Sequence, residues 1–222
     1  MSHRVIAIGD IHGCSTALSA LLDAIRPRPA DTLVPLGDYV NKGPDSRRTL
    51  ERLLRLRSQC QLVPLLGNHD QSMLDAVAGN GDLDEWMDQG GAATLESYGH
   101  GVTTGSIPRR HIQFLKTCRL FFETERHFFV HAAYVPGLPL EQQEEAVLTA
   151  RSLRDSIPAP HISGKTAVVG HTSQKSGEVL DAGHLICIDT NCWAGGWLTA
   201  LDVTNGRMWQ TDVRGRLRRH TA

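Results

Sequence analysis

The sequence predicts a mixed α/β fold in which two packed β-sheets are flanked by helices. Three observations point to it. Strand-like and helix-like segments alternate over residues 4–78, glycine-rich and helical stretches interrupt them at 79–116, and the rest of the chain is rich in β segments. The first part is typical of parallel βα units, and the last part favours antiparallel strands, so we expect one sheet for each.

Residues 4–78 are expected to form three βα units. Apolar runs predict strands at 4–9, 31–37 and 61–67, and helices are expected at 15–25, 44–58 and 69–78. Ser15 could cap the first helix, Pro27 could stop it, and Pro44 suits the first turn of the second. Because the strand segments are apolar throughout, they are expected to be buried on both faces in a largely parallel sheet.

The remaining segments are an insert and a β-rich end. Residues 79–118 are expected to be a small helical insert, with helices near 84–89 and 92–97. Strands are expected at 121–123 and 127–131, a helix near 141–153, and further strands at 167–170, 177–181, 184–189, 198–203 and 207–212. The Asn205-Gly206 pair is a strong hairpin signal. We therefore expect one domain at 1–213, followed by a basic tail at 214–222.

Composition excludes several classes of partner. The chain has 222 residues and is 41% hydrophobic. Its net charge is about −1, so the protein as a whole has no positive electrostatic field that would attract nucleic acid or acidic membranes. The basic tail lacks interleaved aromatics and is expected to be solvated. The five cysteines form no C-x-x-C pair, and no signal peptide or long apolar span is recognised. A cytoplasmic protein with reduced thiols is expected.

Five strand ends carry side chains that bind metals. They are Gly9-Asp10-Ile11-His12-Gly13, Gly37-Asp38-Tyr39-Val40-Asn41-Lys42-Gly43, Gly67-Asn68-His69-Asp70, Val130-His131-Ala132 and Gly170-His171-Thr172. Ligands bind at the carboxyl ends of strands in open α/β sheets, so these side chains can converge on one point. Oxygen and imidazole donors without a thiolate favour Mn²⁺, Fe or Zn²⁺ in an open catalytic site over a structural zinc site.

The spacing predicts two metal ions. Asp10 and His12 can reach one ion, and the carboxylate of Asp38 can bridge two. The other donors, Asn68, His131 and His171, can complete the second ion. Two ions about 3.5–4 Å apart would activate a bridging water for in-line attack at phosphorus. His69 follows Asn68 directly, so it is expected at the edge of the metal site as the general acid.

These motifs, in this order, resemble the PPP-type serine/threonine protein phosphatases, and most closely the compact bacterial and bacteriophage lambda type. The resemblance covers residues 4–210. It implies a calcineurin-like metallophosphoesterase fold, a central β-sandwich flanked by helices. It also implies one metal held by Asp10, His12 and Asp38, and a second held by Asp38, Asn68, His131 and His171. His69 becomes the proton donor and Arg151 a phosphate-binding arginine. Mn²⁺ is the first expectation for both ions, with Fe, Zn²⁺ and Ni²⁺ as alternatives.

Two residues depart from the family pattern. Asn41 and Lys42 stand where the family usually has Asp-Arg. Asn41 can accept a hydrogen bond but brings no charge, so His69 should be less readily protonated. Lys42 keeps a positive charge near the phosphate but loses the planar fork of arginine. The symmetrical diadenosine tetraphosphatases are relatives that also lack this Asp, which keeps a nucleotide substrate open.

The sequence leaves three functions to compare. The first expectation is a metal-dependent phosphomonoesterase acting on phosphoserine or phosphothreonine in a phosphoprotein or phosphopeptide. The alternative is a hydrolase of dinucleoside polyphosphates such as diadenosine tetraphosphate. The third is a phosphatase fold weakened at Asn41 and Lys42 and used as a phosphate-binding module. A cysteine phosphatase or a Walker-type site is excluded, because neither motif is present.

Overall fold

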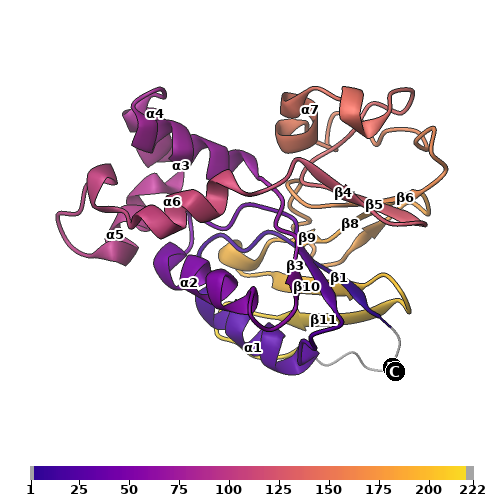
Figure 1. Cartoon of the computed structure of the whole chain (residues 1–222), viewed down its shortest axis with the longest axis horizontal. Coiled ribbons are helices and arrows are strands. Elements are labelled where there is room, and N and C mark those ends of the chain that lie inside the picture. The colour runs from indigo at the N-terminus through magenta and orange to yellow at the C-terminus, as the bar shows by residue number, and fades with distance from the viewer. Residues whose placement is uncertain (1–2, 219–222) are drawn as a thin grey trace.

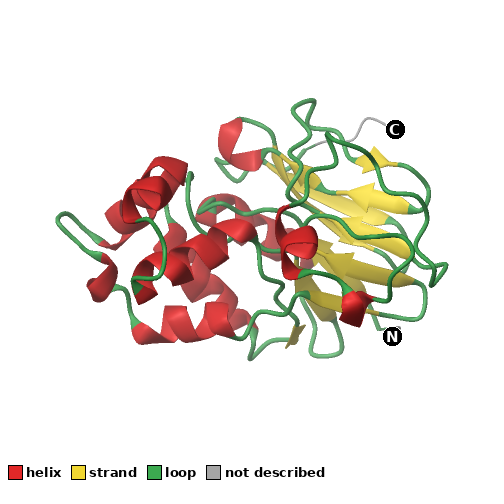
Figure 2. Cartoon of the chain, turned by 90° about the horizontal axis from the view of Figure 1, so that it is seen from above, coloured by secondary structure: helices red, strands yellow, loops and turns green. Residues whose placement is uncertain are grey.

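Two β-sheets lie at the centre of the computed structural model, which describes residues 3–218, and helices cover their outer faces. Figure 2 shows most of the helices gathered on one side of the molecule and the strands on the other. The described part of the chain contains no helix that is long and apolar enough to cross a membrane.

The first sheet combines the start and the end of the chain. Its strand order is β11 (Arg207–Thr211), β10 (Trp197–Asp202), β1 (Val5–Ile8), β2 (Thr32–Pro35) and β3 (Gln61–Leu62), and β9 (Asp189–Thr190) also pairs with β10. The strands β1, β2 and β3 are parallel, as predicted. β10 pairs antiparallel with β1 and, through the turn at Asn205-Gly206, with β11, so the predicted hairpin is present.

The second sheet differs from the prediction. Its order is β4 (Phe121–Glu123), β5 (His127–Val130), β6 (Thr166–Val169), β8 (Leu185–Cys187) and β7 (Leu180–Asp181). We expected antiparallel pairing in this half, but β5, β6 and β8 are mutually parallel and only the two edge strands run the other way. The apolar pattern of a strand shows that it is buried, but not which neighbour it pairs with or in which direction.

Alternating side chains of the strands form the layers of the core. In β1, Val5 and Ala7 belong to the cluster between the sheets, where they meet Phe129 and Val168 of the second sheet. The intervening Ile6 packs with the helices outside. This is the period of two that a strand buried on both faces requires.

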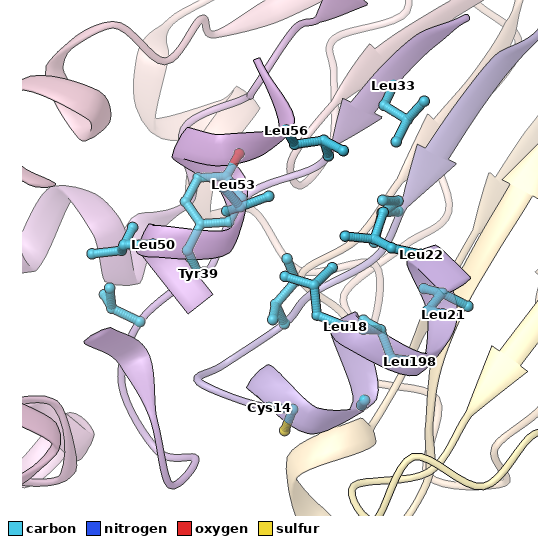
Figure 3. Packing of buried hydrophobic residues seen from close by; sticks show 14 of the residues in the cluster. Cys14, Leu18, Leu21, Leu22, Leu33, Tyr39, Leu50, Leu53, Leu56 and Leu198 are labelled. Carbon is cyan, nitrogen blue, oxygen red and sulfur yellow. The ribbon is translucent and has the colours of Figure 1, made fainter. Parts of the chain in front are cut away.

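The helices lie close to their expected places. They are α1 (Ser15–Ile25), α2 (Ser46–Leu56), α3 (Asn68–Ala78), α4 (Leu83–Trp86), α5 (Ala92–Tyr98), α6 (Arg109–Lys116) and α7 (Glu145–Ala150). Figure 3 shows Leu18 and Leu21 of α1 in the cluster that also contains Leu50 and Leu53 of α2. Each pair is spaced by three residues, which places both members on one helix face.

Some local details differ from the sequence prediction. Cys14, not Ser15, is the residue before α1, and it makes no side-chain cap. The helix α6 was not predicted, and the helix expected at 141–153 is reduced to a short turn at Leu140–Gln142 followed by α7. Of the expected basic tail, Arg216 pairs with Asp212 and Arg218 pairs with Glu178, while residues 219–222 lie outside the described part.

A buried ion pair holds the starts of β1 and β2 together, at the end of the sheet opposite the motifs. Asp31 is fully buried and accepts hydrogen bonds from Arg4 at 2.5 and 3.0 Å and from the Arg28 backbone at 2.7 Å. Burial alone would raise the pKa of Asp31, but the hydrogen bonds from Arg4 and Arg28 outweigh it and hold that pKa well below its ordinary value.

We predict that Asp31→Asn lowers the free energy of unfolding by about 2 kcal/mol at neutral pH, because it leaves the half-buried guanidinium groups of Arg4 and Arg28 without their anion. The folded-state pKa of Asp31 is depressed, so its contribution is present above the unfolded pKa of about 3.9 and is lost as the pH falls below it. Urea unfolding across this pH range measures the difference between variant and wild type. A difference that does not narrow at acid pH, or an equal loss in the exposed control Asp23→Asn, would contradict the account.

Candidate metal centre

Loops that leave the two sheets bring the predicted ligands together. Asp10 and His12 follow β1, Asp38 follows β2, His131 follows β5 and His171 follows β6. The donor atoms form two compact groups, and within each group they lie within 4.8 Å of one another. One group is His12, Asp38 and His69, and the other is Asp38, His131 and His171. Asp38 belongs to both groups, which is the arrangement expected of a bridging residue.

The two oxygens of the Asp38 carboxylate face different imidazoles. Oδ2 lies 3.4 Å from His12 Nε2, and Oδ1 lies 3.5 Å from His131 Nε2. Asn68 Oδ1 lies 3.3 Å from His131 Nε2 and 3.0 Å from His171 Nδ1, so the amide oxygen belongs to the second group. The Asp10 carboxylate accepts a hydrogen bond from the His171 backbone, which brings it beside the same centre.

Backbone carbonyls orient the three histidines. His12 Nδ1 lies 3.1 Å from the Val40 carbonyl, and His131 Nδ1 lies 2.9 Å from the Leu36 carbonyl. A carbonyl can only accept, so the proton is on Nδ1 and the lone pair on Nε2 faces the centre. His171 has a backbone hydrogen bond to Ala150, while its Nδ1 faces Asn68. Metal-binding histidines are typically held by their second ring nitrogen in this way.

Electrostatics favours a cation at this point. Burial first, then Asp189 and Asp38, raises the pKa of Asp10 well above its ordinary value. Burial lowers the pKa of His12 to about 3 and that of His171 to about 4, although Asp38 partly opposes both shifts. The imidazoles of His12 and His171 are therefore neutral, as metal ligands must be. The raised pKa of Asp10 indicates that its carboxylate lacks a compensating cation, whereas burial of Asp38 is outweighed by the neighbouring histidines, which lower its pKa. The residues present thus fit divalent cations.

The backbone at these positions is strained. His12, Asp38 and His171 have φ of 43°, 51° and 60°, in the left-handed region that non-glycine residues rarely adopt. Such conformations cost on the order of 1–3 kcal/mol each and cluster at functional sites. Two glycines make the close approach possible, because a Cβ on Gly67 would lie 2.2 Å from Asp38 Oδ1 and one on Gly170 would lie 2.1 Å from Asp10 Oδ1.

Asp70 joins the loop of Asp38 to the loop of Asn68. Its buried carboxylate accepts three backbone N–H groups, those of Asp38 at 2.7 Å, Tyr39 at 2.9 Å and Gly67 at 3.1 Å. The bond to Gly67 caps α3, as the sequence suggested, and the other two fix the strained turn at Asp38. One side chain therefore sets the relative position of two predicted ligands.

His69 is a member of the first donor group and is oriented by Asn41. Asn41 Nδ2 lies 3.0 Å from His69 Nδ1, and Asn41 Oδ1 accepts a hydrogen bond from the Thr94 hydroxyl at 3.0 Å. Burial, together with Lys42 and His171, lowers the pKa of His69, although Asp38 opposes the shift. The lowered pKa favours the neutral imidazole, and the Asn41 amide donates to its Nδ1. Less of the protonated form is then present at neutral pH to donate a proton.

The predicted phosphate-binding residues lie at the rim. Lys42 Nζ is 3.4 Å from His12 Nε2, and the Lys42 backbone bonds to Gly90 of the helical insert. Arg151 is exposed at the end of α7, directly after Ala150, whose carbonyl holds His171. Lys42 thus contacts a predicted ligand directly, and Arg151 is next in sequence to a residue that contacts another. Their role in binding phosphate stays a prediction.

Three neighbours of the site could not be assigned from the sequence. Thr94 comes from the insert, and its hydroxyl accepts a hydrogen bond from the Asn41 backbone N–H and donates one to Asn41 Oδ1. Asp189 is buried beside Asp10 and accepts a hydrogen bond from Ser173 at 2.6 Å. Trp193 packs edge-on against the His12 imidazole, with ring centroids 6.3 Å apart. None belongs to a motif, and only the position of Asp189 after a late strand hinted at proximity.

We predict that Asp70→Asn weakens divalent-metal binding by about 10- to 100-fold. Asparagine has one acceptor oxygen, so at least one of the three backbone N–H groups loses its partner, at a cost of about 1–3 kcal/mol in stability. Titration calorimetry with Mn²⁺ and urea unfolding measure the two effects. The matched control is Asp75→Asn on the same helix, and an equal loss of metal affinity in that control would refute the bracing role.

Known proteins resemble this chain along most of its length. A bis(5'-nucleosyl)-tetraphosphatase, symmetrical, of Nitrosomonas europaea is 34% identical over 139 residues, which cover 62% of this chain and 47% of that protein. A solved structure of a proposed diadenosine tetraphosphatase is 28% identical, with a TM-score of 0.72, and the match covers 94% of this chain and 92% of that one. A cold-active protein-tyrosine phosphatase of a Shewanella species, at 18% identity and a TM-score of 0.60, shares the fold alone.

The expectation of a protein phosphatase is wrong. The curated relatives and the solved structure at 28% identity are named as nucleotide hydrolases, and these names favour the alternative over a phosphoprotein or phosphopeptide substrate. The error has a physical reason, because the same six ligands serve phosphomonoesters and phosphoanhydrides alike. The chain spans about half the length of the curated relatives that it matches, so their whole activity is not transferred with the likeness.

The family itself is shown by a match to most of the chain. The profile of the calcineurin-like phosphoesterases matches residues 3–162, which include every motif except Gly170-His171-Thr172. The two sheets flanked by helices are the fold expected of that family. The chain therefore belongs to the calcineurin-like phosphoesterase family of metal-dependent hydrolases.

Proposed function

We propose that this protein hydrolyses dinucleoside polyphosphates, with diadenosine tetraphosphate as the representative substrate. The observation that carries the proposal is the likeness to a proposed diadenosine tetraphosphatase over nearly the whole of both chains, joined by the names of the curated relatives. Symmetrical cleavage would release two nucleoside diphosphates.

The chemistry of His69 supports an anhydride substrate. Asn41 brings no charge to His69, and burial lowers the pKa of His69, so less of the imidazole is protonated at neutral pH and the site offers only weak acid catalysis. A serine alkoxide leaves only when it is protonated, whereas a phosphate has a second pKa of about 6 and leaves as an anion. A site with a weak acid therefore suits a substrate whose leaving group is a nucleoside diphosphate.

Each residue of the site then has a defined task. The proposed ligand set comprises Asp10, His12, Asp38, Asn68, His131 and His171, and it would hold two divalent ions, with Mn²⁺ as our first choice. The donor groups contain four of these residues, and Asn68 and Asp10 contact His171 of the second group. When bound, the ions supply Lewis-acid activation of a water and of the phosphoryl group. A water oxygen would bond to phosphorus as the bridging P–O bond breaks. The nucleoside diphosphate would depart as an anion, and the proton of the water would pass to solvent. Lys42 and Arg151 would bind the phosphate oxygens, and His69 would hydrogen-bond the departing oxygen.

We predict that the Mn²⁺-loaded protein converts diadenosine tetraphosphate to ADP and prefers it to a phosphoserine peptide. Removing the metal with a chelator should abolish turnover, and His69→Ala should lower it only on the order of 10-fold, because the departing nucleoside diphosphate needs little protonation. Product analysis with the two substrates side by side measures the preference. A stronger activity on the phosphopeptide would overturn the proposal, as would activity that survives in Asp38→Asn at saturating Mn²⁺.

We also predict that Asn41→Asp changes the substrate preference. The carboxylate would favour protonated His69, so hydrolysis of an alkyl phosphate, which has a poor leaving group, should rise on the order of 10-fold. Diadenosine tetraphosphate needs little protonation, so its kcat should rise much less. The measurement is kcat for both substrates in both variants, with Thr94→Ser as a control that keeps the hydroxyl group. Equal changes for the two leaving groups would show that Asn41 does not act through proton donation.

A further inference from the structure

The rim of the metal centre carries an exposed indole that the ligand set does not explain. Trp193 is 40% exposed, and among the described residues it is the aromatic member of the exposed large apolar side chains. Tryptophan is usually well buried, because its large apolar area makes exposure costly. An exposed indole beside a site is therefore a candidate for contact with a ligand.

The position of Trp193 links it to the phosphate-binding side of the centre. Its ring meets the His12 imidazole edge-on at 76°, and Lys42 Nζ lies over the indole, 5.4 Å from its centroid. The same lysine lies 3.4 Å from His12 Nε2. A polyphosphate that reaches the centre past Lys42 would therefore bring its nucleoside close to the indole.

The turn that carries Trp193 is held rigidly. Cys192–Ala194 form a single 3₁₀ turn between Asn191 and Gly195, which have φ of 65° and 97°. The Asn191 backbone donates to Asp189 Oδ1 at 3.0 Å, and the neighbouring Cys192 is buried. The turn is thus anchored to the interior, which presents the indole with little loss of freedom on binding.

We propose that Trp193 is the stacking platform for a nucleoside base of the substrate, and so a determinant of specificity for nucleotides over other phosphate compounds. This inference rests on the proposed hydrolysis of dinucleoside polyphosphates and deepens it. Lys42 meets the phosphate chain and the indole meets the base, which divides recognition between charge and stacking. Because stacking uses the π-face that every base has, adenine and guanine should bind almost equally.

Two ligands that differ by one nucleoside test the inference. ADP and pyrophosphate share the diphosphate, so titration calorimetry of each with Mn²⁺-loaded protein isolates the contribution of adenosine. Wild type should bind ADP more tightly than pyrophosphate. Trp193→Ala should weaken ADP binding by roughly 5- to 100-fold and leave pyrophosphate within about twofold, whereas Trp193→Phe should keep most of the affinity for ADP. The control Ile162→Ala removes another exposed apolar side chain, and it should leave the affinity for both ligands unchanged.

Several results would overturn the inference. One is equal affinity of wild type for ADP and pyrophosphate, which would mean that the base is not recognised. Another is an equal loss of affinity for ADP and for pyrophosphate in Trp193→Ala, which would show that the indole only positions Lys42. A folded Trp193→Phe, checked by thermal unfolding, that loses as much ADP affinity as the alanine variant would also exclude stacking. If wild type fails to cleave diadenosine tetraphosphate, the proposed function fails separately, and the ratio of ADP to pyrophosphate still decides the role of Trp193.

Discussion

The carboxylate of Asp70, which accepts three backbone N–H groups, is the interaction on which the rest of the site depends. It holds Asp38 and Tyr39 after β2 and Gly67 before α3, so two loops from neighbouring strands become one rigid unit. A buried carboxylate is tolerated only when its hydrogen bonds are satisfied, and here backbone donors supply them. The bridging role that we propose for Asp38 depends on this brace, because its two oxygens can face different groups only while its left-handed turn is held.

The two sheets and the insert provide the stability that this strained arrangement requires. The cluster between the sheets joins residues of both, such as Val34 and Phe129, and it fixes the strand ends from which the loops leave. The helical insert supports the remaining loop, because Thr94 binds Asn41 and Gly90 binds the Lys42 backbone. Catalytic geometry of this kind needs a rigid scaffold, since small displacements of a ligand or an acid lower the rate strongly.

The motif residues stand out in the sequence because an apolar, strand-like run precedes each of them, although β3 itself ends at Leu62, well before Asn68. Their role as metal ligands stays a prediction. Contacts between distant segments were not: Thr94 and Trp193 reach the site only through the fold, and no local pattern marks them. The direction of pairing in the second sheet was missed for the same reason, since burial does not specify a partner. The substrate was misjudged because the ligands fit both chemistries, although Asn41, in place of an acid, was the residue that kept the nucleotide alternative open.

The central claim is that Asp38 bridges two ions held by six side chains. Anomalous diffraction from crystals soaked with Mn²⁺ tests it most directly. The account predicts two peaks about 3.5–4 Å apart on either side of the Asp38 carboxylate, the first near Asp10 and His12 and the second near Asn68, His131 and His171. A single peak, or two peaks that do not share Asp38, would contradict it.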